Sequence, residues 1–346
     1  MLDDRKLKVL QAIINSYIAS AEPIGSRTIS KKYDLGVSSA TIRNEMSDLE
    51  DLGYLNKPYT SAGRIPSDKA YRLYVDTLMQ EIMSFVDFRK KEEVKKILLK
   101  EMREIDQLIQ NSARILSKIT NYTSLAIAPQ FKQSTLKHIQ LISIDEYKVL
   151  VVIISESGVI RNTIFRTDNF ISDEQLTAIS NFLNEKLKGL TLEEISNEID
   201  STIFKEMYEF RSMIQNIVPV ISQSLEDMAE IEVYANGVTN IFNFPEYKDI
   251  DKAKSFLSFI EDKELLVDTL LENTFDDIFI TIGDENPCEE IKDCSLITAT
   301  YKLGGKTIGK IGVIGPTRMD YYKVINAVRV IAVNLSEIID YYFAGK

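Results

Sequence analysis

The sequence predicts an α+β protein of several domains. A chain of 346 residues is too long for one ordinary hydrophobic core, which suggests two or three domains. Apolar residues recur at helical spacing over much of the first 121 residues, whereas residues 137–167 and 278–315 hold β-rich runs separated by turn signals. The composition, with 45% hydrophobic and 27% charged residues, is that of an ordinary soluble protein.

Two helices are predicted near the N-terminus. Residues 4–20 carry apolar side chains every three or four positions, with Asp3 or Asp4 available as N-cap. Ser26 can cap a short second helix, RTISKKYD, and a turn containing Gly36 leads on to a third helix. The cations of the second helix, which we expect to be free for phosphates, are Arg27, Lys31 and Lys32.

The third helix is predicted over residues 38–53, SSATIRNEMSDLEDLG, and it is amphipathic. Its apolar stripe consists of Ile42, Met46, Leu49 and Leu52. Asn44 points nearly opposite, beside Ala40, Thr41, Arg43 and Ser47, and this side is polar and free of acid. Hydroxyl, amide and guanidinium groups reach base edges and phosphates, so we interpret this helix as a DNA recognition helix. Taken alone, the pattern fits an ordinary amphipathic surface helix equally well.

A turn-rich segment follows the third helix. Tyr54 and Leu55 begin a strand, and KPYTSAGRIPS precedes a further helix that Asp68 can cap. Two helices joined by a glycine turn and followed by such an excursion predict a winged helix-turn-helix DNA-binding domain over residues 1–76. The wing residues suited to backbone or minor-groove contact are Lys57, Ser61, Gly63 and Arg64. A solvated loop with incidental charge is the alternative.

The negative charge of the chain lies outside this domain. The formal net charge is -11, but residues 1–76 carry 11 basic and 10 acidic side chains, for +1, and residues 77–346 carry 30 and 42, for -12. Residues 53–75 alone carry +3. An acidic body repels DNA and confines contact to the local basic surface, which favours binding at a specific site.

The remaining two thirds of the chain alternate between helical and β-rich stretches. Residues 69–121 predict a helical connector, assigned to 77–121, that packs on a neighbouring domain; a coiled coil is the alternative. Residues 137–167 predict an antiparallel meander, and Gly304 with Gly305 predicts a hairpin between two later strands. A long helix closes the chain.

Residues 171–272 separate the two groups of strands and look mostly helical. Two capping boxes are predicted there, at Ser172 with Gln175 and at Thr191 with Glu194. A lone hairpin turning at Asn236 and Gly237 is also predicted. The economical interpretation is one α/β sheet domain in two segments, 122–170 and 273–346, interrupted by an inserted domain over 171–272.

Two motifs, SSATIRNEMSDLEDLGYL and SAGRIPSDKAYRLYVD, give the chain a resemblance to the HrcA-type heat-shock transcription repressors of bacteria. The resemblance implies a winged helix, a GAF-like domain and an inserted dimerisation domain, and binding as a homodimer to the CIRCE operator, an inverted repeat upstream of chaperone operons. It further implies that GroE-type chaperonin keeps the repressor active. The residues that match the recognition helix are Ser38, Ser39, Thr41, Arg43, Asn44 and Ser47, and those that match the wing are Lys57, Ser61, Gly63 and Arg64.

No catalytic, cofactor or metal site is predicted. Cys288 and Cys294 have no other sulfur ligand nearby and His138 is the single histidine, so a structural metal is not expected and both thiols should be reduced. The GxxGxxG spacing of Gly309, Gly312 and Gly315 falls in a strand pattern and predicts strand-edge and turn glycines, not a phosphate cradle. No apolar run approaches the roughly 20 residues that span a bilayer, and no signal peptide is evident, so we expect a cytoplasmic protein.

The predicted function is therefore a sequence-specific repressor that binds double-stranded DNA as a homodimer. Arg43 is best placed for guanine or phosphate and Asn44 for adenine. The segment IFKEMYEFRSMIQNIV, residues 203–218, is the expected dimer surface, although internal packing fits its pattern nearly as well. Three alternatives stay open: a winged-helix regulator controlled by a small-molecule effector in its GAF-like domain, an enzyme with an accessory DNA-binding head, and a scaffold whose wing contacts protein.

Overall fold

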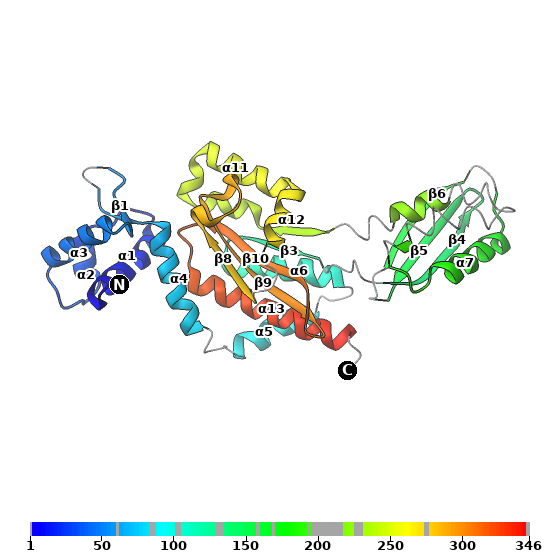
Figure 1. Ribbon diagram of the computed structural model, residues 1–346, viewed down its shortest axis with the longest axis horizontal. Helices are drawn as coiled ribbons and strands as arrows, with labels where there is room; N and C mark the ends of the chain where they lie inside the picture. Colours follow the sequence, from blue (N-terminus) through cyan, green and yellow to red (C-terminus); the bar gives the residue numbers. More distant parts are fainter. Residues whose placement is uncertain are drawn as a thin grey trace. The chain divides into compact units, whose positions relative to one another are not determined.

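The computed structural model has a mixed α/β fold with several sheets (Figure 1). It describes residues 2–59, 62–82, 88–100, 105–128, 135–156, 160–167, 170–191, 194–195, 217–224, 231–272 and 277–343. The chain forms two compact units, one made of residues 1–128 together with 233–344 and the other of residues 129–232. The first unit therefore consists of two segments of the sequence, between which the second unit is inserted.

The first unit begins with three helices and a small hairpin. These elements are α1 (Asp4–Ser20), α2 (Ser26–Lys32), α3 (Ser39–Asp51), β1 (Leu55–Asn56) and β2 (Ile65–Pro66). The Asp3 side chain caps α1 by accepting a hydrogen bond from the Lys6 amide, as predicted. Gly25, and not Ser26, is the N-cap of α2, and it provides no side-chain cap. Buried side chains including Ile13, Ile42 and Leu49 form the core between α1 and α3.

The predicted helical connector consists of three helices. They are α4 (Asp68–Ile82), α5 (Phe88–Lys100) and α6 (Ile105–Thr120). Both α5 and α6 pack on the C-terminal helix α13 (Tyr321–Phe343), and Glu337 of α13 pairs with Lys91 at 2.5 Å and Lys95 at 3.2 Å. Among the described residues, α5 and α6 therefore pack on a helix of the same compact unit, and a separate connector domain over residues 77–121 stays a prediction.

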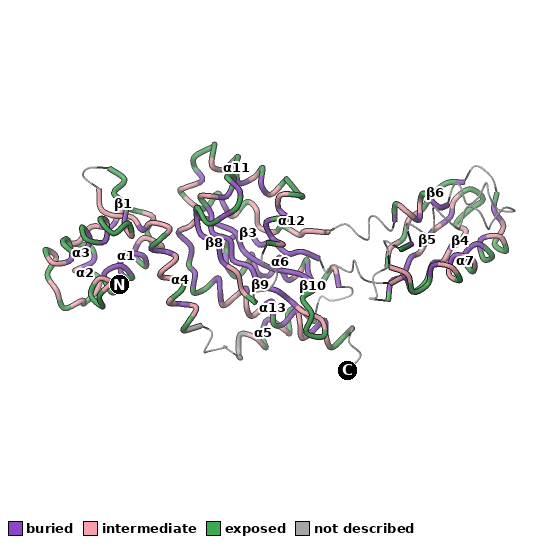
Figure 2. The backbone as a smooth tube through the Cα atoms, viewed as in Figure 1, coloured by how far each residue is buried: buried purple, intermediate pink, exposed green. Residues whose placement is uncertain are grey.

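A five-stranded antiparallel sheet forms the body of the first unit. Its strands are β3 (Thr123–Ile127), β7 (Val233–Asn236), β8 (Ile278–Ile282), β9 (Cys294–Leu303) and β10 (Lys306–Pro316), in the order β7-β3-β10-β9-β8. Helices α6 and α13 pack on this sheet, and Figure 2 shows that β9 and β10 are buried over most of their length. The predicted hairpin between β9 and β10 is confirmed, since Gly304 and Gly305 turn with positive φ angles of 57° and 81°.

The three glycines of the GxxGxxG spacing do not lie at a strand edge, which corrects that prediction. They belong to β10, which is paired on both sides, with β3 and with β9. A Cβ on Gly309 would stand 2.2 Å from the Tyr301 hydroxyl, and one on Gly312 would stand 2.5 Å from a backbone carbonyl of β9. Because these glycines have no Cβ, the Tyr301 side chain and the backbone of β9 can lie directly against β10.

Short helices complete the first unit between β7 and β9. They are η3 (Val238–Asn243), η4 (Pro245–Lys248), α11 (Ile250–Glu261), α12 (Lys263–Leu271), η5 (Gly283–Glu285) and η6 (Glu289–Ile291). The predicted lone hairpin at Asn236 and Gly237 is wrong. Strand β7 pairs instead with the distant β3, and Gly237, with a φ of 67°, leads directly into η3. Asn236 and Gly237 favour a turn, as the sequence suggested, but here the turn joins a strand to a helix and not two strands.

The second unit is a three-stranded antiparallel sheet covered by a helix. Its described elements include β4 (Leu136–Asp145), β5 (Lys148–Ser155), β6 (Ile160–Arg166) and α7 (Asp173–Leu187). The meander is confirmed, and so are both capping boxes: Ser172 with Gln175, and the mutual hydrogen bonds of Thr191 and Glu194. Its core joins one face of the sheet to α7 and also includes Ile217.

The predicted domain boundaries differ from the two units. Residues 137–167 were assigned to the sheet domain with residues 273–346, but their strands pair only with one another among the described residues. Conversely, residues 233–272 belong to the first unit and not to the insert. Alternation of apolar and polar residues shows that a segment is a strand, but it does not identify the strand with which it pairs. Residues 137–167 were therefore assigned to a sheet more than 100 residues away in the sequence.

The close approach at Gly312 gives a test of the sheet packing. Gly312→Ala should lower the free energy of unfolding by about 1–3 kcal/mol, because the new methyl group meets backbone atoms that cannot move aside. Urea unfolding followed by circular dichroism measures the change. Gly25→Ser is the control, since a Cβ there meets nothing within 4 Å and serine is a favourable N-cap for α2. Equal stability of both variants would contradict this account of β10.

Candidate nucleic-acid interface

Helix α3 begins with a well-formed cap. The Ser38 hydroxyl accepts a hydrogen bond from the Thr41 amide at 3.1 Å and lies 3.0 Å from the Thr41 hydroxyl. Such a cap satisfies backbone donors that the first turn otherwise leaves unpaired. Ser38 and Thr41, both predicted to contact DNA, therefore have a structural role at this end of α3, where Ser39 is the first helical residue.

Charged contacts with α1 fix the orientation of α3 about its own axis. Glu45 lies on the buried side of α3 and pairs with Lys6 at 2.9 Å and with Arg5 at 3.5 Å. Lys6 also pairs with Asp48 at 3.1 Å. Hydrogen bonds that Lys6 donates to the Glu45 and Asp48 carboxylates raise the pKa of Lys6 above its usual range, so this cation stays charged. Together with buried Ile42 and its apolar neighbours, these contacts leave the opposite side of α3 facing outward.

The outward side of α3 presents the side chains that the sequence predicted. Arg43, Asn44 and Ser47 are all exposed. Asp51 is exposed as well, and it lies three helical turns beyond Ala40 on the same side. The prediction of an acid-free side therefore holds only as far as Ser47, which covers the N-terminal two thirds of the helix.

Helix α2 adds a basic depression next to α3. Arg27, Thr28, Lys31 and Lys32 line a shallow pocket of about 340 Å³, and the three cations are exposed. Helices α2 and α3 pack against each other. A concave surface with several cations and a hydroxyl suits a phosphate group, because it combines charge with hydrogen-bond donors.

The hairpin of residues 55–66 is tied closely to the rest of the first unit. Arg64 and Ile24 exchange two backbone hydrogen bonds of 2.8 and 2.9 Å, and a Cβ on Gly63 would lie 2.5 Å from the Ile24 backbone. Gly63 is therefore needed for this close approach to the Ile24 backbone, which gives the glycine a structural role. Lys57 is exposed, while Ser61 lies outside the described residues.

Arg64 was predicted to contact DNA, but its side chain already has a protein partner. Its guanidinium bonds the Glu50 carboxylate of α3, with Nε donating at 2.7 Å and Nη2 at 2.5 Å. Four-fifths of the Arg64 side chain is buried. Arg64 therefore joins the hairpin to α3, a role that the sequence pattern did not indicate because Glu50 lies 14 residues away.

The sequence analysis did not select two residues that the structure places beside this surface, Tyr59 and Lys69. Tyr59 is 62% exposed at the hairpin, two positions after Lys57, and the signal that could have identified it is an aromatic residue in a basic loop. Lys69 donates from Nζ to the Leu52 carbonyl at 2.9 Å and lies 4.5 Å from the centre of the Tyr54 ring. A cation there complements the C-terminal end of α3.

The described residues offer little chemistry for catalysis. They hold no group of three or more His, Cys, Asp or Glu that could bind a metal ion. Cys288 and Cys294 are free and buried, and burial raises the pKa of Cys294 to about 12, which makes it a poor nucleophile. His138 is exposed on β4 beside Gln140. In the same described part of the chain, no helix combines the length and the apolar character needed to cross a membrane.

An exposed polar helix flanked by cations is the kind of surface that regulators of the DNA-binding class present to a duplex. Comparison with known proteins agrees with this class. Residues 106–325 match the family model described as the HrcA protein C terminal domain. The chain belongs to the HrcA family.

Relatives match the chain over nearly its whole length. Proteins named heat-inducible transcription repressor HrcA are 48% identical in Alkaliphilus metalliredigens, covering 98% of both chains, and 46% identical in Clostridium acetobutylicum, covering 94% of both. A solved structure, described as the crystal structure of a hypothetical protein at 2.2 Å resolution, is 22% identical. It covers 98% of this chain and 99% of its own with a TM-score of 0.70, which shows a shared fold.

The pairing of Arg64 with Glu50 gives a test of the interface. Arg64→Ala should destabilise the first unit by about 1 kcal/mol, since a partly buried, two-donor ion pair is lost. Thermal unfolding measures this effect. Lys57→Ala is the control, because Lys57 is exposed on the same hairpin and should leave stability unchanged. If the two variants unfold alike, Arg64 does not hold the hairpin to α3.

Proposed function

We propose that this protein is a sequence-specific transcription repressor of chaperone operons that places α3 in the major groove of DNA. On this proposal residues 1–76 form a winged helix-turn-helix domain, with α3 as the recognition helix and the hairpin of residues 55–66 as the wing. The observation that carries the proposal is the outward side of α3, where Arg43, Asn44 and Ser47 are exposed while charged contacts hold the opposite side on α1. Relatives named transcription repressors support a regulator in preference to an enzyme.

The exposed side chains of α3 suit base recognition. A guanidinium can donate two hydrogen bonds to the edge of guanine, and a carboxamide can pair with adenine in the same way. We assign these roles to Arg43 and Asn44, with Ser47 contacting a base or a phosphate. Ser38, Ser39 and Thr41 lie at the N-terminal end of α3, the end that enters the groove first in helix-turn-helix proteins.

Phosphate contacts come from the flanking elements. The depression formed by Arg27, Thr28, Lys31 and Lys32 suits one phosphate group, and Lys57 and Tyr59 of the wing suit the neighbouring backbone. Such contacts set the position of the protein on the duplex without reading its sequence. The net charge of -12 over residues 77–346 keeps the remainder of the protein away from DNA.

Binding to an inverted repeat requires a two-fold protein, and we propose that the second unit supplies the dimer interface. One face of its sheet packs on α7, whereas the other carries aliphatic side chains in register across the three strands. Ile142 lies opposite Leu150, which lies opposite Ile164. Ile144 and Ile160 are further exposed isoleucines of this sheet. An exposed apolar sheet face is typical of an interaction surface.

This location differs from the predicted dimer surface at residues 203–218. Residues 203–216 lie outside the described part of the chain, and Ile217 and Val218 are buried in the core of the second unit. At that end of the segment, internal packing is therefore the better account.

The finer features of the function come from the family resemblance. We propose that the inverted repeat is the CIRCE operator, that the five-stranded body is the GAF-like domain, that GroE-type chaperonin keeps the repressor active, and that the protein acts in the cytoplasm. The antiparallel sheet with α6 and α13 packed on it supports the second of these assignments.

The role of Arg43 can be tested directly. Arg43→Ala should weaken binding to a CIRCE duplex by about 1–3 kcal/mol and reduce discrimination against random DNA, because a base contact is lost. Fluorescence anisotropy at fixed salt measures both affinities. The control is Lys254→Ala, which removes an exposed cation from α11 in the body. Unchanged discrimination in the Arg43 variant would exclude a base-reading role.

The dimer surface can be tested in the same protein. Ile164→Asp should give monomers in sedimentation velocity, because it places a charge in the middle of the apolar sheet face, where Ile164 is 58% exposed. Ile250→Asp is the matched control, since this isoleucine is 80% exposed on the first unit. A dimeric Ile164 variant would place the interface elsewhere.

A further inference from the structure

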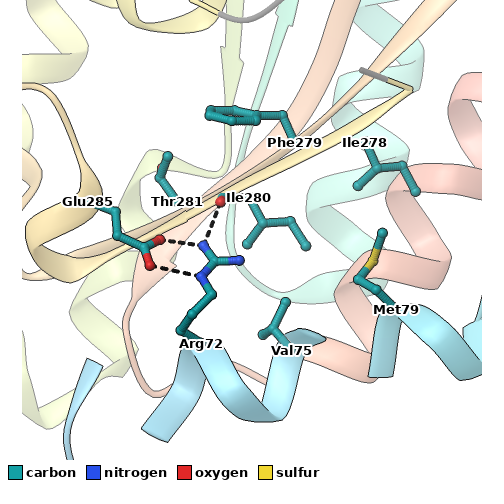
Figure 3. A pocket seen from close by; sticks show the side chains of 8 residues that line it. All are labelled: Arg72, Val75, Met79, Ile278, Phe279, Ile280, Thr281 and Glu285. Carbon is teal, nitrogen blue, oxygen red and sulfur yellow. Dashed lines mark hydrogen bonds and ion pairs between the residues drawn. The ribbon is translucent and has the colours of Figure 1, made fainter. Parts of the chain in front are cut away.

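Arg72 of α4 bonds the edge of the five-stranded sheet. Its Nε donates to Glu285 Oε1 at 2.8 Å, and its Nη2 donates both to Glu285 Oε2 and, at 2.7 Å, to the Ile280 carbonyl of β8 (Figure 3). Glu285 is itself held in place, because it accepts a hydrogen bond of 2.9 Å from the Ile282 amide. We call Arg72, Glu285 and Ile280 the α4 latch.

A second arginine belongs to the body and donates a hydrogen bond to the N-terminal helices. Arg318 follows β10 and donates to the Ile18 carbonyl at 2.8 Å, near the C-terminal end of α1. The same side chain bonds Glu246 through two nitrogens, at 2.5 and 3.2 Å, and is only 9% exposed. Carbonyls at a helix C-terminus have no intrahelical donor, so a cation is well placed there.

The backbone of the sheet is shaped to receive α4. Gly283 has a φ of 57°, and a Cβ on it would stand 1.7 Å from Asp68 Oδ2. The same carboxylate accepts a hydrogen bond of 3.3 Å from the Asp284 amide. Tyr71, one turn further along α4, is fully buried with its ring 5.7 Å from that of Tyr321 on α13. The contact between α4 and the body is therefore close at Asp68, which only a glycine at position 283 permits, and at the buried Tyr71.

The contact is nevertheless not a continuous apolar core. Figure 3 shows Val75 and Met79 of α4 facing Ile278 and Ile280 of β8, and these side chains border an open cleft of about 440 Å³. Where apolar packing is incomplete, the orientation of α4 on the sheet depends more strongly on the hydrogen bonds and the ion pair of the α4 latch. Loss of one latch residue should therefore loosen this end of α4 without unfolding the protein.

We propose that Arg72 and Arg318 are positioning residues for DNA binding. Neither needs to touch DNA: together they hold α1–α4, and with them α3, in one orientation on the five-stranded body. This inference rests on the proposed function as a dimeric repressor. Fixing α3 on the body that carries it removes one source of variation in the distance between the two recognition helices of a dimer, so it narrows the range of half-site spacings at which both helices can enter the major groove.

Loss of the α4 latch should change the preference for half-site spacing as well as the affinity for DNA. Arg72→Gln should bind a CIRCE duplex about ten-fold more weakly, because a loosened helix lowers the effective concentration of the second half-site. It should bind a single half-site within about two-fold of the wild type, since α3 itself is unchanged. Its preference for the natural spacer over one lengthened by about 5 base pairs, half a helical turn, should be smaller than that of the wild type.

The experiment measures these three duplexes by anisotropy with full-length wild type, Arg72→Gln, Glu285→Gln and the double variant. Because both residues belong to one latch, the double variant should match the single variants and not add to them. Lys252→Gln is the control: it removes a 2.8 Å ion pair with Asp293 inside the body and should keep the wild-type spacing preference. Circular dichroism checks that each variant is folded.

Each outcome has a distinct meaning. A wild type that fails to bind the inverted repeat would overturn the proposed function, and the inference with it. A wild type that binds the repeat, with a spacing preference equal to that of Arg72→Gln, would overturn the inference alone. A loss of spacing preference in both latch variants, with half-site binding retained, would support it.

Discussion

The opposition between the two sides of α3 is the constraint on which the proposed interface depends. One side is held on α1 by buried Ile42 and by Glu45, whose carboxylate pairs with Lys6. Rotation of α3 about its axis would separate Glu45 from Lys6 and expose Ile42 to water, so it is disfavoured. The same interaction that stabilises this part of the protein thus determines which side chains of α3 face outward.

Local patterns predicted the elements that depend on neighbouring residues. The amphipathic α3, the Gly304–Gly305 hairpin and the capping box at Ser172 all follow from residues a few positions apart. Strand partners could not be predicted in this way, because β3 and β7 are more than 100 residues apart in the sequence. The assignment of residues 137–167 to the wrong sheet has the same cause.

The candidate interface shows the same division between local and distant effects. The exposure of Arg43 and Asn44 follows from helical periodicity alone, so the sequence was sufficient to predict it. The pairing of Arg64 with Glu50 and the contact of Gly63 with Ile24 depend on how the hairpin folds back, which no short motif specifies. Basic residues beside α3 can thus stabilise the fold, and only the folded structure distinguishes them from exposed basic residues such as Lys57.

The pairing of β3 with β7 brings together the two points at which the second unit joins the body. Ile127, at the end of β3, lies opposite Val233, at the start of β7, so the chain leaves and rejoins the body at two adjacent points. A tight turn could join these strands, and the hydrogen-bonded framework of the body would be complete without the intervening hundred or so residues. In topology the second unit is therefore an insertion between two paired strands of the body, and the pairing of those strands does not depend on the length of the inserted segment.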